Sequence, residues 1–171
     1  AIARFAAARD AEPGNPARQQ NLAVALKNAG QFNDALAAFH EALRLRPGHA
    51  ATLANMASCL IAADRSAEAL ALLDGAADHP DVCNHRGVAL ARLGRRAEAA
   101  QAYARALALR PGHVETRLNL ADVADGAEAE RLAAAVLAEI PGHPRAANQL
   151  GLLRERAGDH AGAAGALAQG Y

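Results

Sequence analysis

Apolar residues recur at helical spacing along the chain, in short blocks that end at Gly or Pro. The stretch "NLAVALKNAG" has this spacing and stops at Gly30, a residue suited to a helix C-terminus. The next stretch, "QFNDALAAFHEALRLRPG", carries one apolar stripe at spacings i, i+4, i+7 and i+8: Ala35, Phe39, Ala42 and Leu43. Pro47 cannot continue that second helix. Each pair of blocks therefore predicts two antiparallel helices joined by a tight turn.

The pattern returns along the chain as an internal repeat. Pro-Gly pairs begin at Pro13, Pro47, Pro111 and Pro141, so neighbouring pairs lie 34, 64 and 30 residues apart. The middle interval holds one more turn, at "DHPDV". A single array is expected, with these parts: 1–15, the second helix of a partial repeat; 16–49, a repeat; 50–79, a shortened repeat; 80–113, a repeat; 114–143, a shortened repeat; and 144–171, a partial repeat.

Each shortened repeat is four residues shorter than the others, which is close to one helical turn. The repeat at 50–79 is expected to lose the last turn of its second helix. The repeat at 114–143 is expected to lose a turn at its hairpin, where Asp125 and Glu128 form a candidate capping pair for the restarted helix. A local irregularity is expected at both places, and no domain boundary.

The residues inside each unit resemble the tetratricopeptide repeat (TPR) family over the whole chain. The first full unit matches the family pattern with Leu22-Ala23, Leu26, Gly30, Ala35, Phe39, Ala42 and Pro47. The unit at 80–113 matches it with Arg86-Gly87, Leu90, Gly94, Ala99, Tyr103, Ala106 and Pro111. The resemblance implies an all-α, right-handed superhelical solenoid of tandem antiparallel helix hairpins. One hairpin cannot bury its apolar stripe alone, whereas stacked hairpins can.

Composition argues against two classes of function, nucleic-acid binding and membrane insertion. Hydrophobic residues make up 52% of the chain, enough for a core, and 18 basic residues balance 18 acidic ones. No charge field therefore favours nucleic acid or an anionic membrane. Aromatic residues make up only 3% and Trp is absent, so a stacking platform for single-stranded nucleic acid is missing too. No apolar run is long enough to cross a bilayer. Neither nucleic-acid binding nor membrane insertion is expected.

A hydrogen-bonding side chain recurs at position 6 of each predicted first helix: Asn21, Asn55, His85, Asn119 and Gln149. A carboxamide can accept from a peptide N–H and donate to a peptide C=O at once. A row of them could hold an extended chain by its backbone, in the concave groove that the family's first helices line. This asparagine ladder resembles that of the repeat region of O-linked N-acetylglucosamine transferases. The alternative is that each Asn bonds a neighbouring helix or loop.

Other positions face the groove by the family pattern. Secondary contacts are expected from Gln20, Lys27, Asn84, Arg92 and Asp122. Further groove-facing residues include Glu115, Leu118, Arg145, Leu152 and Arg156. The lining is mixed, with no continuous basic stripe. A clamp for acidic chain ends is disfavoured, because only Lys27 and Arg92 are candidates for it.

Metal binding and catalysis find little support. His49, His113 and His143 each follow Pro-Gly in different repeats, too far apart to share an ion, and are expected to be turn residues at the start of the next helix. "DHPDVCNH" is denser, but Cys83 and His85 point away from each other on a helix. Cys59 is expected to fill the core. No catalytic motif is present. We expect no catalytic residue, metal or cofactor, and no enzyme activity.

The predicted function is a protein-interaction module, a scaffold or adaptor that binds a protein or extended peptide in its groove. One alternative is the substrate-recruiting repeat region of a larger, bacterial-looking enzyme such as an O-linked glycosyltransferase. Another is a scaffold that self-associates into homo-oligomers through uncapped repeat ends, since "AGAAGALAQGY" is a poor polar cap and a longer parent array is expected. Two cysteines are too few for a disulfide framework, so the cytoplasm is the expected location, with the periplasm left open.

Overall fold

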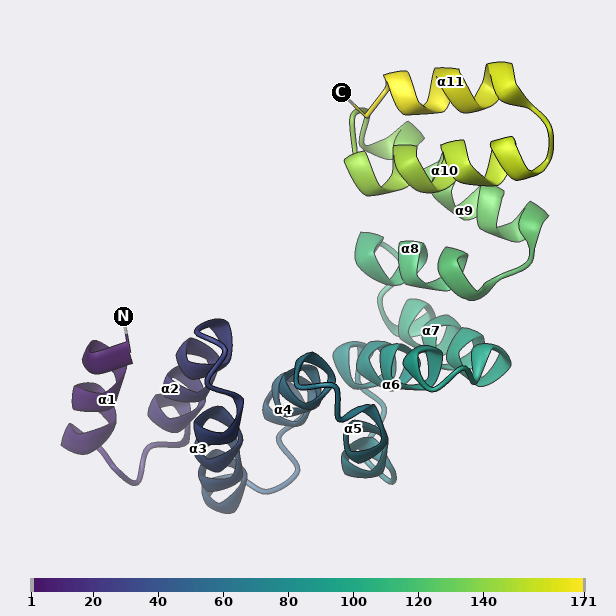
Figure 1. Ribbon diagram of the computed structural model, residues 1–171. Coiled ribbons are helices and arrows are strands. Elements are labelled where there is room, and N and C mark those ends of the chain that lie inside the picture. The colour runs from purple at the N-terminus through teal and green to yellow at the C-terminus, as the bar shows by residue number, and fades with distance from the viewer. Residues whose placement is uncertain (1, 171) are drawn as a thin grey trace. The chain divides into compact units, whose positions relative to one another are not determined.

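The computed structural model describes residues 2–170, and these form eleven α-helices without a strand (Figure 1). Within each unit, neighbouring helices pair as antiparallel hairpins with tight turns. The predicted all-α fold of tandem hairpins is confirmed. Ala1 and Tyr171, the outermost residues of the two predicted partial repeats, lie outside the described residues.

The helices divide between two compact units, Ala1–Leu93 and Gly94–Tyr171. The N-terminal unit holds α1 (Ile2–Ala11), α2 (Pro16–Asn28), α3 (Phe32–Leu45), α4 (Ala50–Ala62), α5 (Ser66–Leu73) and α6 (Pro80–Arg92). The C-terminal unit holds α7 (Arg96–Leu109), α8 (Val114–Val123), α9 (Gly126–Glu139), α10 (Pro144–Arg156) and α11 (His160–Ala168).

The N-terminal unit has a continuous apolar core. Each of its helices packs against its neighbour in sequence, and α6 packs against both α4 and α5. Phe39, Leu73 and Val82 are completely enclosed in this core. Ala23 and Ala57 are also fully buried, so small side chains let the helices approach closely. The turn after α2 ends at Gly30, whose φ of +76° favours glycine.

The C-terminal unit repeats this plan around a smaller core. Leu118, Val136, Leu137 and Leu150 form its centre, together with buried alanines of α9, α10 and α11. Figure 1 shows α10 and α11 running antiparallel, and the two helices are in contact. An added Cβ on Gly151 would lie 2.8 Å from the Cγ atom of Leu167, so a larger residue here would force Leu167 to shift.

Two helices are shorter than their counterparts. Helix α5 has 8 residues, whereas α3 and α7 each have 14. Helix α8 has 10 residues, whereas α2, α4, α6 and α10 each have 13. Asp125 is the N-cap residue of α9, but its side chain makes no capping hydrogen bond. The expected capping pair of Asp125 and Glu128 is therefore wrong, and the helix starts without it.

Histidine is the N-cap residue of four helices, those that begin at Ala50, Pro80, Val114 and Pro144. The N-cap residues are His49, His79, His113 and His143. In the last three, Nδ1 accepts a 3.3 Å hydrogen bond from a backbone N–H at the helix start: those of Asp81, Thr116 and Ala146. Only a ring nitrogen without a proton can accept. The predicted position of His49, His113 and His143 at helix N-termini is confirmed.

The His113 cap provides a test of this role. We expect His113→Ala to lower the free energy of unfolding by about 0.5–1 kcal/mol, because it leaves an N–H of α8 without its acceptor. His113→Asn should retain most of the stability, since Asn is a favoured N-cap. Urea unfolding followed by circular dichroism measures both variants. An equal loss of unfolding free energy in the Ala and Asn variants would mean that the His113 ring contributes by packing and not by capping.

The His49 ring makes the N-terminal unit sensitive to acid. Burial lowers the pKa of His49, and the charges of Arg46 and His79 lower it further. The folded unit therefore favours the neutral ring. The associated stability is fully present above the unfolded pKa of about 6.5 and is lost as pH falls through the lower folded value. We expect His49→Asn, which does not titrate, to lose less stability than the wild type between neutral and mildly acidic buffer. Urea unfolding of both proteins at both pH values measures the loss. An equal decrease in the free energy of unfolding on acidification would contradict this expectation.

Candidate functional site

The candidate side chains occupy the same place in five helices. Asn21, Asn55, His85, Asn119 and Gln149 are each the sixth residue of their helix: α2, α4, α6, α8 and α10. The same helices carry a buried Ala or Gly at the eighth residue. Asn21 is exposed and the other four are half-buried. The five side chains therefore share a helical position but differ in their surroundings.

In the N-terminal unit, Asn21 borders a hollow between α1 and α2. Arg4, Phe5, Ala8 and Arg18 complete the lining, around a volume of about 520 Å³. Asn55 lies on α4. The Nδ1 atom of His85 lies 2.7 Å from the backbone oxygen of Asp81, one turn earlier in α6. Since a carbonyl only accepts, His85 donates from Nδ1.

The predicted secondary contacts of this unit connect neighbouring first helices. Lys27 donates from Nζ to Ser58 Oγ on α4 at 3.3 Å. Gln20 Oε1 accepts from Thr52 Oγ1 at 2.7 Å. Arg92 of α6 donates to the backbone oxygen of Ile61 in α4 at 3.4 Å. Asn84 is buried, at 8% exposure, so it faces the protein interior.

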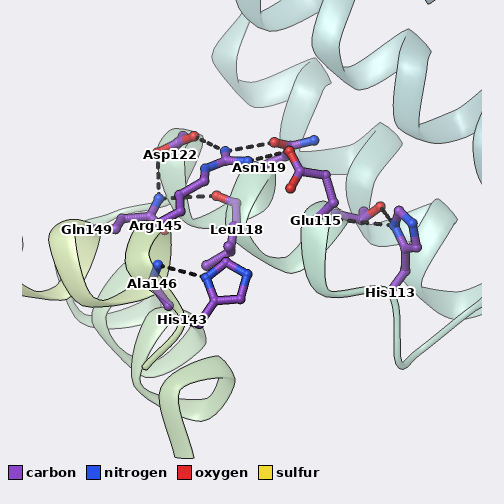
Figure 2. A network of polar contacts seen from close by, with 10 residues as sticks. His113, Glu115, Leu118, Asn119, Asp122, His143, Arg145, Ala146 and Gln149 are labelled. Atoms are coloured by element: carbon purple, nitrogen blue, oxygen red, sulfur yellow. Dashed lines mark hydrogen bonds and ion pairs between the residues drawn. The ribbon is translucent and has the colours of Figure 1, made fainter. Parts of the chain in front are cut away.

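The C-terminal unit gathers its predicted residues around one guanidinium group. Figure 2 shows Arg145 of α10 lying between Glu115, Asn119 and Asp122 of α8. Arg145 Nη2 donates to Asn119 Oδ1 at 2.8 Å and to Asp122 Oδ2 at 2.7 Å, and Nη1 pairs with Glu115. Gln149 donates from Nε2 to Leu118 O at 3.1 Å and to Asp122 Oδ1. The carboxamides of Asn119 and Gln149 are thus already engaged.

Burial and neighbouring charges shift the pKa values of two groups in this region, Arg145 and Tyr103. Burial alone would lower the pKa of Arg145, but Asp122 and Glu115 more than offset it and raise that pKa. Beneath the network, burial raises the pKa of the Tyr103 hydroxyl, and Asp122 adds to the effect. Arg145 therefore stays charged and Tyr103 stays neutral across the physiological range.

Arg145 and Glu115 were expected in the groove but not among the main contacts. They are the second residues of α10 and α8, and they carry opposite charges. Opposite charges at one position of neighbouring repeats are the sequence signal for this ion pair. That signal does not identify Arg145 as the centre of the network, since Asn119 and Asp122 lie one and two turns further along α8 than Glu115.

The possible metal ligands and the two cysteines show no arrangement that indicates a reactive site in the described residues. Within residues 2–170, no three His, Cys, Asp or Glu side chains converge in a way that could hold a metal ion. Cys59 and Cys83 are free and buried. Burial raises the pKa of both thiols, and Asp78 raises that of Cys83 further. Cys59 fills the core, as predicted.

Two family models match the chain, both described as Tetratricopeptide repeat. One covers residues 28–81 and the other covers residues 80–113, so together they span half of the sequence. The chain belongs to the tetratricopeptide repeat family. Comparison with curated proteins gives no match.

Solved structures of TPR proteins share the fold. PilW, described as a widely conserved type IV pilus biogenesis factor, has a TM-score of 0.85 at 19% identity, over 98% of this chain and 81% of its own. YrrB, described as a TPR protein with an unusual peptide-binding site, has a TM-score of 0.68 at 22% identity, over 99% and 92%. A thermophilic TPR protein of Thermus thermophilus has a TM-score of 0.74 at 22% identity, over 98% and 89%.

These solved structures show the fold alone, and membership of the tetratricopeptide repeat family supports a protein–protein interaction scaffold. At such identities they do not carry over the particular ligand of any relative. None of the helices described in the TPR chain has the length and apolar character needed to cross a membrane.

The Arg145 network makes a testable contribution to stability. We expect Arg145→Met to lower the free energy of unfolding by about 1 kcal/mol, since the partly exposed ion pairs are weakened by water. Asn119 and Asp122 also lose a donor. Arg131→Met on α9 is a matched control, because that side chain is 71% exposed. Urea unfolding of both variants measures the difference, and an equal effect would show that the network adds nothing.

Proposed function

We propose that this TPR chain binds an extended polypeptide through the side chains at the sixth residue of its first helices. The observation that carries the proposal is the recurrence of a hydrogen-bonding side chain at that residue in five helices. Three are Asn and one is Gln, and a carboxamide matches both the donor and the acceptor of a peptide group. Such a surface holds a backbone with little regard for side chains. Such a surface suits a scaffold or adaptor role.

The side chains at the sixth residue differ between the two units in how accessible they are to a ligand. Asn21 is exposed beside a hollow of about 520 Å³, so a ligand can approach it directly. Asn119 and Gln149 are held by the Arg145 network, so a ligand must share or replace those hydrogen bonds. The alternative that Asn bonds a neighbouring helix therefore describes the C-terminal unit in part, since the donor to Asn119 comes from α10.

A recruiting role beside a catalytic domain would use the same surface. Binding a polypeptide without reading its side chains suits an enzyme that modifies many substrates. The proposed peptide contacts are the same in both cases. Self-association through the C-terminal end stays a prediction. Among the described residues of α11, Leu167 is the one large apolar side chain that is exposed, at 37%, beside exposed alanines.

The proposal is tested by replacing three carboxamides. We expect Asn21→Ala, Asn55→Ala and Asn119→Ala together to weaken binding to a degenerate peptide library at least about tenfold, because each loses hydrogen bonds worth about 0.5–1.5 kcal/mol net. Fluorescence anisotropy with the labelled library measures the affinity. Asn33→Ala, on the exposed face of α3, is the matched control and should bind like the wild type.

Circular dichroism would establish that the triple variant keeps its helices. An unchanged affinity in a folded triple variant contradicts the carboxamide surface. Loss of affinity in the Asn33→Ala control would contradict it as well, because the effect would then not depend on helix position.

A further inference from the structure

A second hollow lies in the C-terminal unit, beside the Arg145 network. It has a volume of about 320 Å³ and is bordered by the start of α7, the end of α8 and one face of α10. Its lining includes Arg96, Asp122, Gln149, Leu152, Leu153 and Arg156. The last four lie at helical spacing on α10, so that helix presents an amide, an aliphatic surface and a guanidinium group in sequence.

The unbalanced charge of this hollow is positive. Its one carboxylate, Asp122, is paired with Arg145 Nη2 at 2.7 Å, on a guanidinium group shared with Glu115, and also accepts from Gln149. Arg96 donates to the backbone oxygen of Asp122 at 3.1 Å, a contact that leaves its charge unpaired. Arg156 is exposed and makes no hydrogen bond or ion pair with residues 2–170. Two guanidinium groups are therefore available to a ligand anion.

The hollow also exposes an aliphatic side chain. Leu152 is 55% exposed, the highest value among the large apolar residues exposed on the described chain. Leu153 beside it is half-buried. An apolar side chain of a ligand that covered Leu152 would remove this surface from water. The next residue on this face toward the C-terminus is Arg156, one turn along α10, so the aliphatic and cationic contacts are adjacent.

Gln149 has one hydrogen-bonding atom left unused. Its Nε2 donates to two acceptors, and Oε1 is shielded from solvent without a donor in the described part of the chain. A buried acceptor without a donor is costly. A ligand N–H that reached Oε1 from the hollow would satisfy it.

We propose that this hollow selects a polypeptide segment in which an acidic side chain adjoins an apolar one. The carboxylate binds to Arg96 and Arg156, the apolar side chain covers Leu152 and Leu153, and a backbone N–H bonds to Gln149. This inference rests on the proposed function and adds selectivity to it. The carboxamides hold the backbone of any segment, and the hollow favours acidic-apolar ones over basic ones.

Two degenerate peptide pools test the selectivity. Both contain random apolar and small residues, with Glu at every charged position in one pool and Lys in the other. We expect the wild type to bind the Glu pool about tenfold more tightly, because charge-assisted contacts are favourable for one pool and repulsive for the other. Raising the salt concentration should narrow the difference.

Matched variants locate the effect. Arg156→Gln should weaken binding of the Glu pool about three- to tenfold and leave the Lys pool unchanged or improved, since a partly exposed charge contact is lost. Leu152→Ser should weaken both pools, because both contain apolar residues. Arg131→Gln removes the same charge from an exposed site on α9 that is outside the hollow, and it should bind both pools like the wild type.

The outcomes separate this inference from the proposed function. Equal binding of the two pools by the wild type overturns the selectivity but leaves backbone binding in place. An equal loss in Arg131→Gln and Arg156→Gln also overturns it, because net charge would then be the cause. Failure of the wild type to bind either pool refutes the proposed function and this inference with it.

Discussion

The first helix of each hairpin buries a small residue against its neighbours. This burial sets the orientation of every helix that carries a candidate ligand-binding side chain. The eighth residue of α2, α4, α6, α8 and α10 is Ala or Gly, and all five are buried: Ala23, Ala57, Gly87, Ala121 and Gly151. Two residues correspond to a rotation of about 200° around an α-helix, so the sixth residue lies on the opposite side. Fixing one position toward the core thus directs the other away from it. The contact of Gly151 with Leu167 shows how little room this orientation leaves.

The sequence could predict these features because they depend on short-range spacing. The hairpins follow from apolar stripes and from turn residues such as Gly30, whose positive φ the structure shows. The place of His113 and His143 follows from their position after Pro-Gly, one residue before an apolar-periodic segment. Asp125 shows that sequence position predicts the N-cap residue but not its hydrogen bond, since this residue occupies the N-cap without making one.

The environment of each candidate side chain depends on contacts between repeats, which no spacing rule supplies. Asn21 and Asn119 are equivalent in sequence, yet one is exposed and the other accepts from Arg145, which is 26 residues away. That hydrogen bond depends on the side-chain conformation of an arginine on another helix and on its competing carboxylates. Asn84 likewise was expected to face a ligand and is buried. A repeat pattern therefore identifies equivalent positions without establishing equivalent chemistry.

The Arg145 network affects the charge selectivity that we propose for the C-terminal unit. Without Arg145, the carboxylates of Glu115 and Asp122 would repel an acidic ligand, and the arginines of the nearby hollow would be partly neutralised by them. With Arg145 in place, Asp122 is occupied and the hollow keeps an excess of positive charge. The same network already hydrogen-bonds the Asn119 and Gln149 amides, so a ligand must compete for them. In the proposed function, the same ion pairs thus weaken nonselective backbone binding in this unit, while in the proposed selectivity they leave the arginines of the hollow available to an acidic ligand.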